Sequence, residues 1–284
     1  MEAGSMNVIF EDTAIDAVRD YWDARPCNIR HSLKPIGERD YYLEVRQRKH
    51  FVEPHIPGFA EFAKWNGKRV LEVGCGLGTA SFCFAEAGAQ VTSVDLSSRS
   101  LEIAQQGART LGLEDRMTFA VADAEHLAET LPHAHYDLVY SFGVIHHTPH
   151  PDAALAQIRK LVKPGGTLKV MVYHRYSWKV LWLIMTEGKG AFWRADEIIA
   201  RNSEAQTGCP VTYSYSRSSA RAWVERHGFA VEDIYVDHVF PYRISDYVQY
   251  RYVKNWYFRI MPQPVFRAFE RIFGWHLMIT ARAM

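Results

Sequence analysis

The stretch of sequence that decides the fold reads Arg69-Val70-Leu71-Glu72-Val73-Gly74-Cys75-Gly76-Leu77-Gly78-Thr79. Its apolar start predicts a short buried strand, which the three glycines interrupt, and the residues from Thr79 to Ala85 then have the pattern of a helix. A strand, a glycine loop and a helix in this order bring backbone N–H groups close to a ligand. The stretch therefore predicts a ligand-binding loop.

A second apolar run, from Ala89 to Val94, ends at Asp95, which lies 19 residues beyond Gly76. An acidic residue at the tip of the second strand can accept hydrogen bonds from both hydroxyls of a ribose. The dinucleotide-binding fold has a similar loop, but its fingerprint requires a third glycine where this chain has Thr79. The pair of features predicts a ribose-bearing ligand and counts against a nucleotide-dependent oxidoreductase, which remains one alternative.

Strands and helices alternate beyond this loop. Such alternation predicts a parallel sheet that is covered by helices on both faces. The expected strands are 89–94, 117–122, 136–141, 167–173, 231–239 and 276–282, and the expected helices are 97–111, 151–162 and 219–227.

Three ordered features accompany the glycine loop, namely Asp123 after the third strand, the strand Tyr136-Asp137-Leu138-Val139, and the turn and strand Leu161-Val162-Lys163-Pro164-Gly165-Gly166-Thr167-Leu168. With Glu72-x-Gly74-x-Gly76-x-Gly78, they make residues 68–174 resemble the class I S-adenosylmethionine (SAM)-dependent methyltransferases. The loop Gly143-Val144-Ile145-His146-His147 is similar to that of the small-molecule branch, which includes quinone-type methyltransferases. The resemblance implies an α/β fold with a Rossmann-like, seven-stranded, mostly parallel sheet. It also implies methyl transfer from SAM, with S-adenosylhomocysteine (SAH) as the product.

The resemblance also implies which residues hold SAM. The glycines lie beside the methionine part, Asp95 holds the ribose, and Asp123 reaches the adenine amino group. Helix capping is the alternative role for both aspartates. The residues expected to bind the cofactor are Glu72, Gly74, Cys75, Gly76, Gly78, Asp95, Leu96, Asp123, Ala124 and Phe142.

His146 and His147 follow the fourth strand, at the carboxyl edge where open parallel sheets bind ligands. Methyl transfer is an in-line displacement, and a hydroxyl acceptor must also lose a proton. Histidine suits that task, so both histidines are candidate catalytic residues, together with Tyr21 and Tyr173. Packing, or holding of the Thr148-Pro149 turn, is the alternative role. We expect no metal, because a site of His146, His147 and His174 would lack a carboxylate.

The segments outside the predicted sheet are expected to cover this site. Residues 1–65 form a helical N-terminal cap, with helices at 11–22 and 41–51, ahead of a SAM-binding domain over 66–284. Helical insertions near 174–215 and 240–275 are expected to act with the cap as a lid. Four residues are expected to bind an anionic group on a flat or apolar acceptor, since arginine forms forked hydrogen bonds to such groups. These are Arg30, Arg175, Tyr242 and Arg243.

Composition limits the function classes. The 284 residues are 48% apolar and 23% charged, which suits one large domain with a sizeable core. Lys plus Arg number 33 against 32 for Asp plus Glu, so there is no global field to attract nucleic acid. Residues 141–144 lack the Asn/Asp-Pro-Pro-aromatic motif, which also argues against methylation of base amino groups. A nucleic-acid methyltransferase is therefore the less favoured alternative.

The four cysteines are scattered, which is typical of a reduced, cytoplasmic setting. No signal peptide or membrane span is expected. The aromatic and basic segment 240–259 would present one charged face if it were a single helix, so membrane-surface contact, by an enzyme or a non-catalytic SAM-binding protein, is a further alternative. The acceptor, the methylated atom and the oligomeric state stay open at this point.

Overall fold

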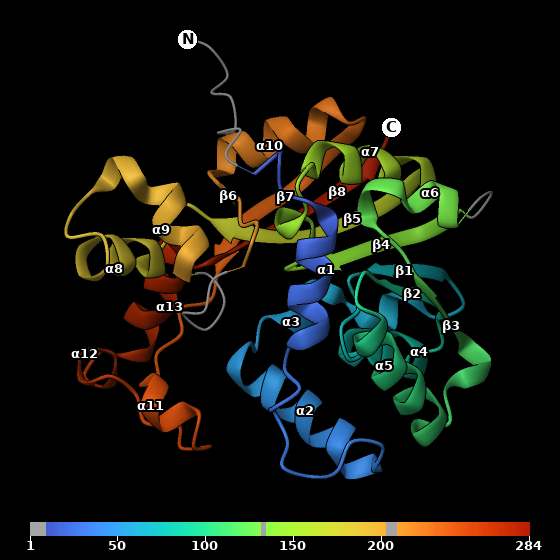
Figure 1. Cartoon of the computed structure of the whole chain (residues 1–284), viewed down its shortest axis with the longest axis horizontal. Coiled ribbons are helices and arrows are strands. Elements are labelled where there is room, and N and C mark those ends of the chain that lie inside the picture. The colour runs from blue at the N-terminus through green and yellow to red at the C-terminus, as the bar shows by residue number, and fades with distance from the viewer. Residues whose placement is uncertain (1–9, 132–134, 203–208) are drawn as a thin grey trace.

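The computed structural model describes residues 10–131, 135–202 and 209–284. Within these residues, eight strands form one sheet in the order β3-β2-β1-β4-β5-β8-β7, with the short β6 paired to β5 (Figure 1). The predicted mostly parallel sheet is confirmed, and β6 is an addition to it. The strands are β1 (Arg69–Val73), β2 (Gln90–Asp95), β3 (Met117–Val121), β4 (Tyr136–Phe142), β5 (Val162–His174), β6 (Ser214–Tyr215), β7 (Phe229–Asp237) and β8 (His276–Ala283).

The last strand, β8, runs antiparallel to both of its neighbours, β5 and β7. Its first residue, His276, therefore pairs with Tyr173 near the end of β5 and with Asp237 at the end of β7. The start of β8 thus lies at the same edge as the carboxyl ends of the parallel strands. This edge is where ligands bind in open α/β sheets.

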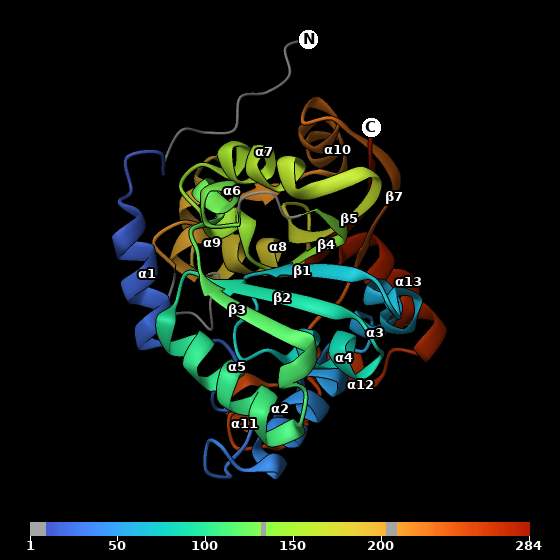
Figure 2. The same cartoon turned by 90° about the vertical axis from the view of Figure 1, so that its right-hand side faces the viewer.

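Helices cover both faces of the sheet (Figure 2). One face packs against α2 (Arg39–Val52), α4 (Thr79–Glu86) and α5 (Ser98–Leu111), in a core that includes Tyr42, Phe82 and Ile103. The other face packs against α1 (Ile15–Ala24), α6 (Leu127–Thr130), α7 (Pro151–Leu161) and α10 (Arg217–Arg226). Alternate residues of a strand point to opposite faces, as Val70 and Leu71 do here.

Local signals explain where these elements begin and end. Ser97 caps α5 by accepting the N–H of Ser100, and Gly112 ends the helix in the left-handed conformation. β5 begins at Val162, whereas the sequence predicts a turn over 163–166 and a strand only from Thr167. The pairing with β4 is irregular here: it moves from Tyr136↔Val162 to Leu138↔Thr167, so the four residues 163–166 stand opposite a single residue of β4, which agrees with the predicted turn.

The N-terminal segment and the two segments after β5 and β7 contain short helices. The cap contains α1, α2, α3 (Ile56–Ala60) and the 3₁₀ turn Phe62–Trp65. The first insertion contains α8 (Trp178–Thr186), the turn Phe192–Arg194 and α9 (Ala195–Asn202). The second contains α11 (Ile244–Tyr247), α12 (Trp256–Arg259) and α13 (Gln263–Phe273). Further 3₁₀ turns span Glu114–Arg116, Ala124–His126 and Ile145–His147.

The segment 240–259 is not a single helix, so its basic residues do not form the charged helical face considered above. Tyr250 has a φ of 61°, which interrupts the helix, and Tyr242 forms a β-bridge with Lys254. The segment packs on the cap instead. The Arg48 guanidinium of α2 lies 3.9 Å from the centre of the Tyr250 ring and 4.4 Å from that of Tyr247. Cation–π contacts therefore hold the second insertion to the cap.

In the described part of the chain, no helix has both the length and the apolar character that a membrane crossing requires.

Candidate functional site

A cavity of about 290 Å³ opens at the carboxyl edge of the sheet. Its floor comes from the ends of β1 to β5 and the start of β8, and its cover comes from α1, α2 and α3 of the cap. Most of the residues that the resemblance assigns to SAM line it. Among the lining residues are Ile15, Val18, Trp22, Lys49, His50, Glu53, Ile56, Glu72, Gly74, Cys75, Gly76, Asp95, Leu96, Asp123, Ala124, Phe142, His147, Tyr173 and His276.

The three glycines of the loop serve two purposes, close packing and access for a ligand. All three have positive φ values, of 76° at Gly74, 53° at Gly76 and 82° at Gly78. A Cβ on Gly74 would collide with Val144, and one on Gly78 would meet Phe82, so these two allow close packing. A Cβ on Gly76 would meet nothing within 4 Å, so this residue leaves room for a ligand to approach the backbone. Gly78 does not line the cavity.

Asp95 connects the second strand to this loop. Its Oδ2 accepts the backbone N–H of Gly76 at 2.8 Å, and its Oδ1 accepts that of Ser97 at 2.9 Å. Burial raises the pKa of Asp95, while these backbone N–H groups lower it. The carboxylate lines the cavity with lone pairs to spare for the hydroxyls of a ribose.

Glu72 is buried beside the loop, on β1. It accepts a hydrogen bond from the Ser81 hydroxyl of α4, and Ser81 Oγ lies 2.7 Å from Ser93 Oγ of β2. Burial raises the pKa of Glu72 to about 7. Hydrogen bonds through Ser81 therefore link the start of α4 to Glu72 of β1 and to Ser93 of β2. Glu72 also lines the cavity.

Asp123 both caps a turn and lines the cavity, so the two roles considered for it are compatible. Its Oδ1 accepts the N–H of Glu125 at 2.9 Å, and its Oδ2 lies 3.1 Å from His126 Nδ1. Leu96 and Phe142 line the same space from the ends of β2 and β4. An apolar, flat group can lie between such side chains, with the aspartates at its polar rim.

His147 and His146 differ in position although they are adjacent. His147 lines the cavity, and its Nδ1 lies 2.8 Å from the carbonyl oxygen of Val211. Since a carbonyl only accepts, Nδ1–H is the donor and Nε2 carries the lone pair of the neutral ring. The first insertion, to which Val211 belongs, thus orients His147. No described residue between 174 and 215 lines the cavity itself.

His146 is fully buried behind His147, and it is absent from the cavity wall. Its ring lies 4.0 Å from that of Tyr173, between centroids, and neither ring nitrogen has a hydrogen-bond partner in the described part of the chain. Burial lowers its pKa well below the usual value. Of the two histidines, only His147 lines the cavity.

Of the two tyrosines expected to be catalytic, Tyr173 lines the cavity and Tyr21 does not. Tyr173 lines the cavity and stacks on Trp275, with 4.1 Å between the ring centroids. Trp22, which is not among the candidates named from the sequence, lines the cavity, and its ring centroid lies 5.6 Å from that of His147. Tyr21 does not line it and lies under the Arg25 guanidinium instead. The helical phase of α1 is the reason, because adjacent residues point in different directions.

The three arginines expected to meet an anion do not line the cavity. Arg175 donates two hydrogen bonds to Asp196, at 2.8 and 3.1 Å, and Arg243 pairs with Asp246 at 2.8 Å. Arg30 is exposed, and its carbonyl accepts the Tyr250 hydroxyl. Tyr242, also expected there, stacks on Phe51. Acidic residues of their own segments thus hold Arg175 and Arg243 away from the cavity.

Sequence reasoning missed several polar residues at this edge. Lys49, Glu53 and His276 line the cavity, and His55 and His238 lie directly behind them. Glu53, His238 and His276 could together hold a metal ion. The signal available in the sequence is Glu53-Pro54-His55, a carboxylate and an imidazole on either side of a proline after a helix. Lys49 is the only lysine or arginine among the described residues that line the cavity.

Comparison with known families matches residues 70–166 to the methyltransferase domain. The ubiquinone biosynthesis O-methyltransferase of Nitrosospira multiformis is 36% identical over 118 residues, which are 41% of this chain and 48% of that protein. That of Idiomarina loihiensis is 40% identical over 119 residues, which are 42% of this chain and 45% of that protein. The chain thus spans about half the length of these curated relatives.

Solved structures show the same fold over nearly the whole chain. The magnesium protoporphyrin IX methyltransferase of Synechocystis with bound SAH has a TM-score of 0.60 and 16% identity, covering 95% of this chain and 100% of that one. The cyclase SpnF has a TM-score of 0.56 and 18% identity, covering 94% of each chain. A fold can host different activities, so these likenesses concern architecture alone. The matched domain is more specific, and its loop and acidic residues line the cavity described above. Residues 70–166 are therefore similar to a methyltransferase domain, within a fold that the solved structures share.

Proposed function

We propose that the protein transfers a methyl group from SAM to a small, flat acceptor bound in the cavity at the carboxyl edge. The observation that carries the proposal is the position of Asp95 and the open Gly76 on one wall, with His147 and Tyr173 on the same cavity. The first two suit a ribose and an amino-acid group, and the second two suit an acceptor. The cap would exclude water from both, because α1 and α2 cover the cavity.

The residues present fit SAM. Asp95 would bind the ribose hydroxyls, Gly76 would let the methionine part approach the backbone, and Asp123 would accept from the adenine amino group. When bound, SAM supplies an electrophilic methyl group on a sulfonium. The task of this chain is then to align an acceptor atom with that methyl group and to receive a proton.

The acceptor side of the proposal follows from the aromatic wall. Trp22, Phe142 and Tyr173 favour a flat or apolar body, and an oxygen acceptor agrees with the O-methyltransferase activity named for the curated relatives. His147 would take the hydroxyl proton on Nε2, since Nδ1 is bound to Val211. In-line geometry and this base together would supply the catalysis.

Lys49 is the positive charge that an anionic group in the cavity would meet, in place of the three arginines. A carboxylate of SAM and an anionic group of the acceptor are the two candidates for it. The Lys49→Met variant distinguishes these two candidates. It would weaken SAH affinity if Lys49 binds the SAM carboxylate, and it would raise the acceptor KM if Lys49 binds the acceptor.

The proposed function is tested by calorimetry with SAH. We expect Asp95→Ala to weaken SAH binding by more than about tenfold, because ribose hydroxyls lose their acceptor. Asp115→Ala is the control, since Asp115 is exposed and precedes β3 at the opposite edge of the sheet. Equal affinity of a folded Asp95→Ala protein and the wild type would contradict the assignment.

A second candidate function is methyl transfer at a membrane surface, to a quinone-like or lipid acceptor. It is favoured by large apolar side chains that stay exposed on the second insertion, Trp256 at 72% and Ile260 at 71%. Sedimentation with anionic liposomes is the measurement. A Trp256→Ser variant should sediment less than the wild type, and equal recovery in the supernatant for both would contradict this alternative.

A further inference from the structure

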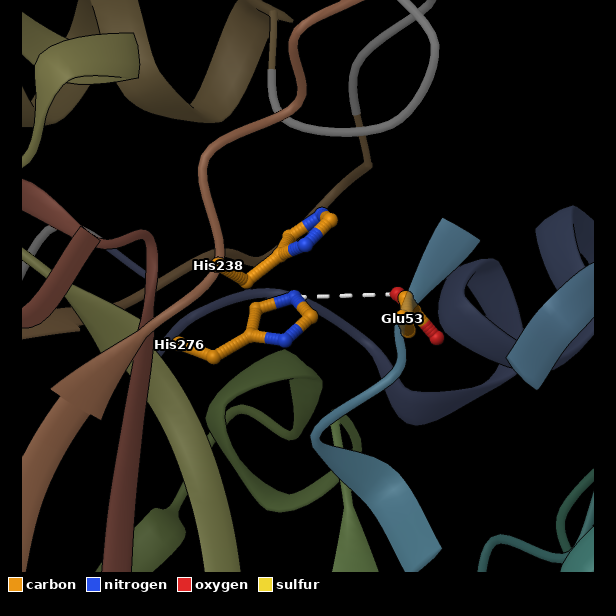
Figure 3. Close-up of side chains that lie close together, drawn as sticks. All are labelled: Glu53, His238 and His276. Carbon is orange, nitrogen blue, oxygen red and sulfur yellow. Dashed lines mark ion pairs between the residues drawn. The ribbon is translucent and has the colours of Figure 1, made fainter. Parts of the chain in front are cut away.

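Three imidazoles and a carboxylate meet at the carboxyl edge, outside the residues that the family resemblance assigns. Figure 3 shows Glu53, His238 and His276, which follow α2, follow β7 and begin β8 respectively. Their potential ligand atoms all lie within 4.8 Å of one another. His276 Nε2 and Glu53 Oε1 are 3.8 Å apart, as the dashed line marks. The antiparallel insertion of β8 brings these distant parts of the chain together.

The orientation of His276 is fixed by a fourth residue, His55. His55 Nε2 lies 3.0 Å from His276 Nδ1. A histidine that binds a metal commonly uses its second ring nitrogen in a hydrogen bond that fixes the ring. Here that bond occupies Nδ1 and leaves Nε2 directed toward Glu53. His55 is therefore a positioning residue for His276.

His238 is held in place by its backbone rather than by its ring. Its φ is 71°, a left-handed conformation that is uncommon outside glycine. Its N–H donates to Asp237 Oδ1 at 2.7 Å, and its carbonyl accepts the Trp275 N–H at 2.8 Å. The ring stacks on the His276 ring, with 4.6 Å between their centroids. A buried imidazole on a left-handed backbone beside a second buried imidazole suits a ligand-binding group.

The chemistry of the group suits a transition metal. His238 and His276 are buried, and imidazole is the commonest metal ligand among protein side chains. A neutral imidazole offers a nitrogen lone pair, and Glu53 adds a carboxylate oxygen. Two histidines and one carboxylate form the donor set of many catalytic zinc and non-haem iron sites, which keep positions open for another ligand.

We propose that Glu53, His238 and His276 bind one divalent transition-metal ion of the zinc type in the wall of the cavity. Glu53 and His276 both line the cavity, so the open positions of the ion would face the bound acceptor. This orientation rests on the proposed methyl transfer, for which a bound ion would lower the pKa of an acceptor hydroxyl. His147 would then receive the hydroxyl proton while the acceptor oxygen takes the methyl group and SAH leaves.

The three side chains would have to move together to bind an ion, because their ligand atoms lie up to 4.8 Å apart. Bonds of about 2.0–2.2 Å to nitrogen and oxygen place neighbouring ligand atoms roughly 3.0–3.5 Å apart. The 3.8 Å between His276 Nε2 and Glu53 Oε1 exceeds this by a fraction of an ångström. The Glu53 side chain is 22% exposed and can rotate toward the ring. His276 stays in place because its Nδ1 is bound to His55.

Zinc binding to the full chain, without SAM or acceptor, tests the proposal. The protein is stripped with a chelator and titrated with ZnCl₂ by calorimetry, and the metal content is measured after dialysis. We expect one zinc per chain in the wild type and affinity at least about tenfold weaker in Glu53→Gln and in His238→Asn. His150→Gln, which removes an exposed imidazole, is the control that should bind as the wild type does.

Absence of saturable zinc binding by the wild type, or equal affinity in Glu53→Gln, overturns the proposal. Glu53→Gln preserves size and is partly exposed, so it carries the test alone if the His238 variant fails to fold. Thermal unfolding checks each variant. Because the readout is metal content, a negative result leaves the methyl-transfer proposal standing, and loss of SAH binding by Asp95→Ala is judged separately.

Discussion

Asp95 at the end of β2 accepts the backbone N–H of Gly76 in the glycine loop at 2.8 Å. Asp95, the proposed ribose acceptor, and the glycine loop proposed for the methionine part are therefore hydrogen-bonded to each other. A ligand that satisfies Asp95 also depends on the conformation of the loop.

This link predicts that asparagine cannot replace Asp95. Both carboxylate oxygens accept backbone N–H groups, from Gly76 and from Ser97, whereas an asparagine amide presents an NH₂ group to one of them. Asp95→Asn should thus weaken SAH binding by about tenfold or more, nearly as much as Asp95→Ala. Calorimetry of both variants measures this, and near wild-type affinity for Asp95→Asn would show that the loop does not need the second oxygen.

Substitutions of His147 and of His146 should have different effects on kcat. His147→Gln removes the proposed base and should lower kcat by roughly 10²–10⁴-fold with unchanged SAH affinity. His146→Leu removes a ring whose nitrogens have no hydrogen-bond partner in the described residues, so kcat should stay within about threefold. Steady-state rates with any accepted substrate decide. A larger loss in the His146 variant would reverse the assignment.

Trp22 and Tyr21 form a matched pair on α1. Trp22→Ala removes a ring from the cavity wall and should raise the acceptor KM about tenfold or more, as expected for a buried aromatic contact. Tyr21→Phe should change neither KM nor SAH affinity, because Tyr21 does not line the cavity. The two KM values are the measurement. A Tyr21→Phe effect equal to that of Trp22→Ala would place Tyr21 in the site after all.

Arg243→Lys should leave the acceptor KM unchanged. The arginine side chain is 54% exposed and pairs with Asp246 of its own segment, and a lysine can keep an exposed pair of this kind. If Arg243 bound an anionic acceptor, as expected from the sequence, loss of its forked hydrogen bonds would instead raise the KM. The ratio of the KM values for the variant and the wild type distinguishes the two expectations.

Glu72 should make the protein without ligand less stable as pH rises. Burial raises its pKa from 4.5 to about 7, so the folded protein keeps a proton that the unfolded chain has lost in this range. The stabilisation is full below about pH 4.5, falls as pH rises toward 7, and totals about 3 kcal/mol. Glu72→Gln should therefore raise the free energy of unfolding at pH 8 relative to the wild type. Urea unfolding at pH 5 and 8 tests this, and an equal difference at the two pH values would contradict it.

The sequence predicts the floor of the site well, because strand ends and glycines obey local rules. Val70 to Gly78 and Asp95 need only their own neighbours to adopt their conformations. The sequence does not predict that the arginines lie outside the cavity, because the pairing of Arg175 with Asp196 depends on how the first insertion folds. It also misses His276, since no local pattern shows that the last strand enters the sheet between β5 and β7.

That position of β8 sets an order of events during synthesis on the ribosome. β1 to β4 and the glycine loop can associate as soon as they emerge, but β5 and β7 lack their shared neighbour until residues 276–283 are translated. In that interval both strands have an unpaired edge, which invites aggregation. The nascent chain also lacks the His276 side of its cavity. A chaperone that shields these edges is expected to raise the yield of folded protein most when translation pauses just before residue 276.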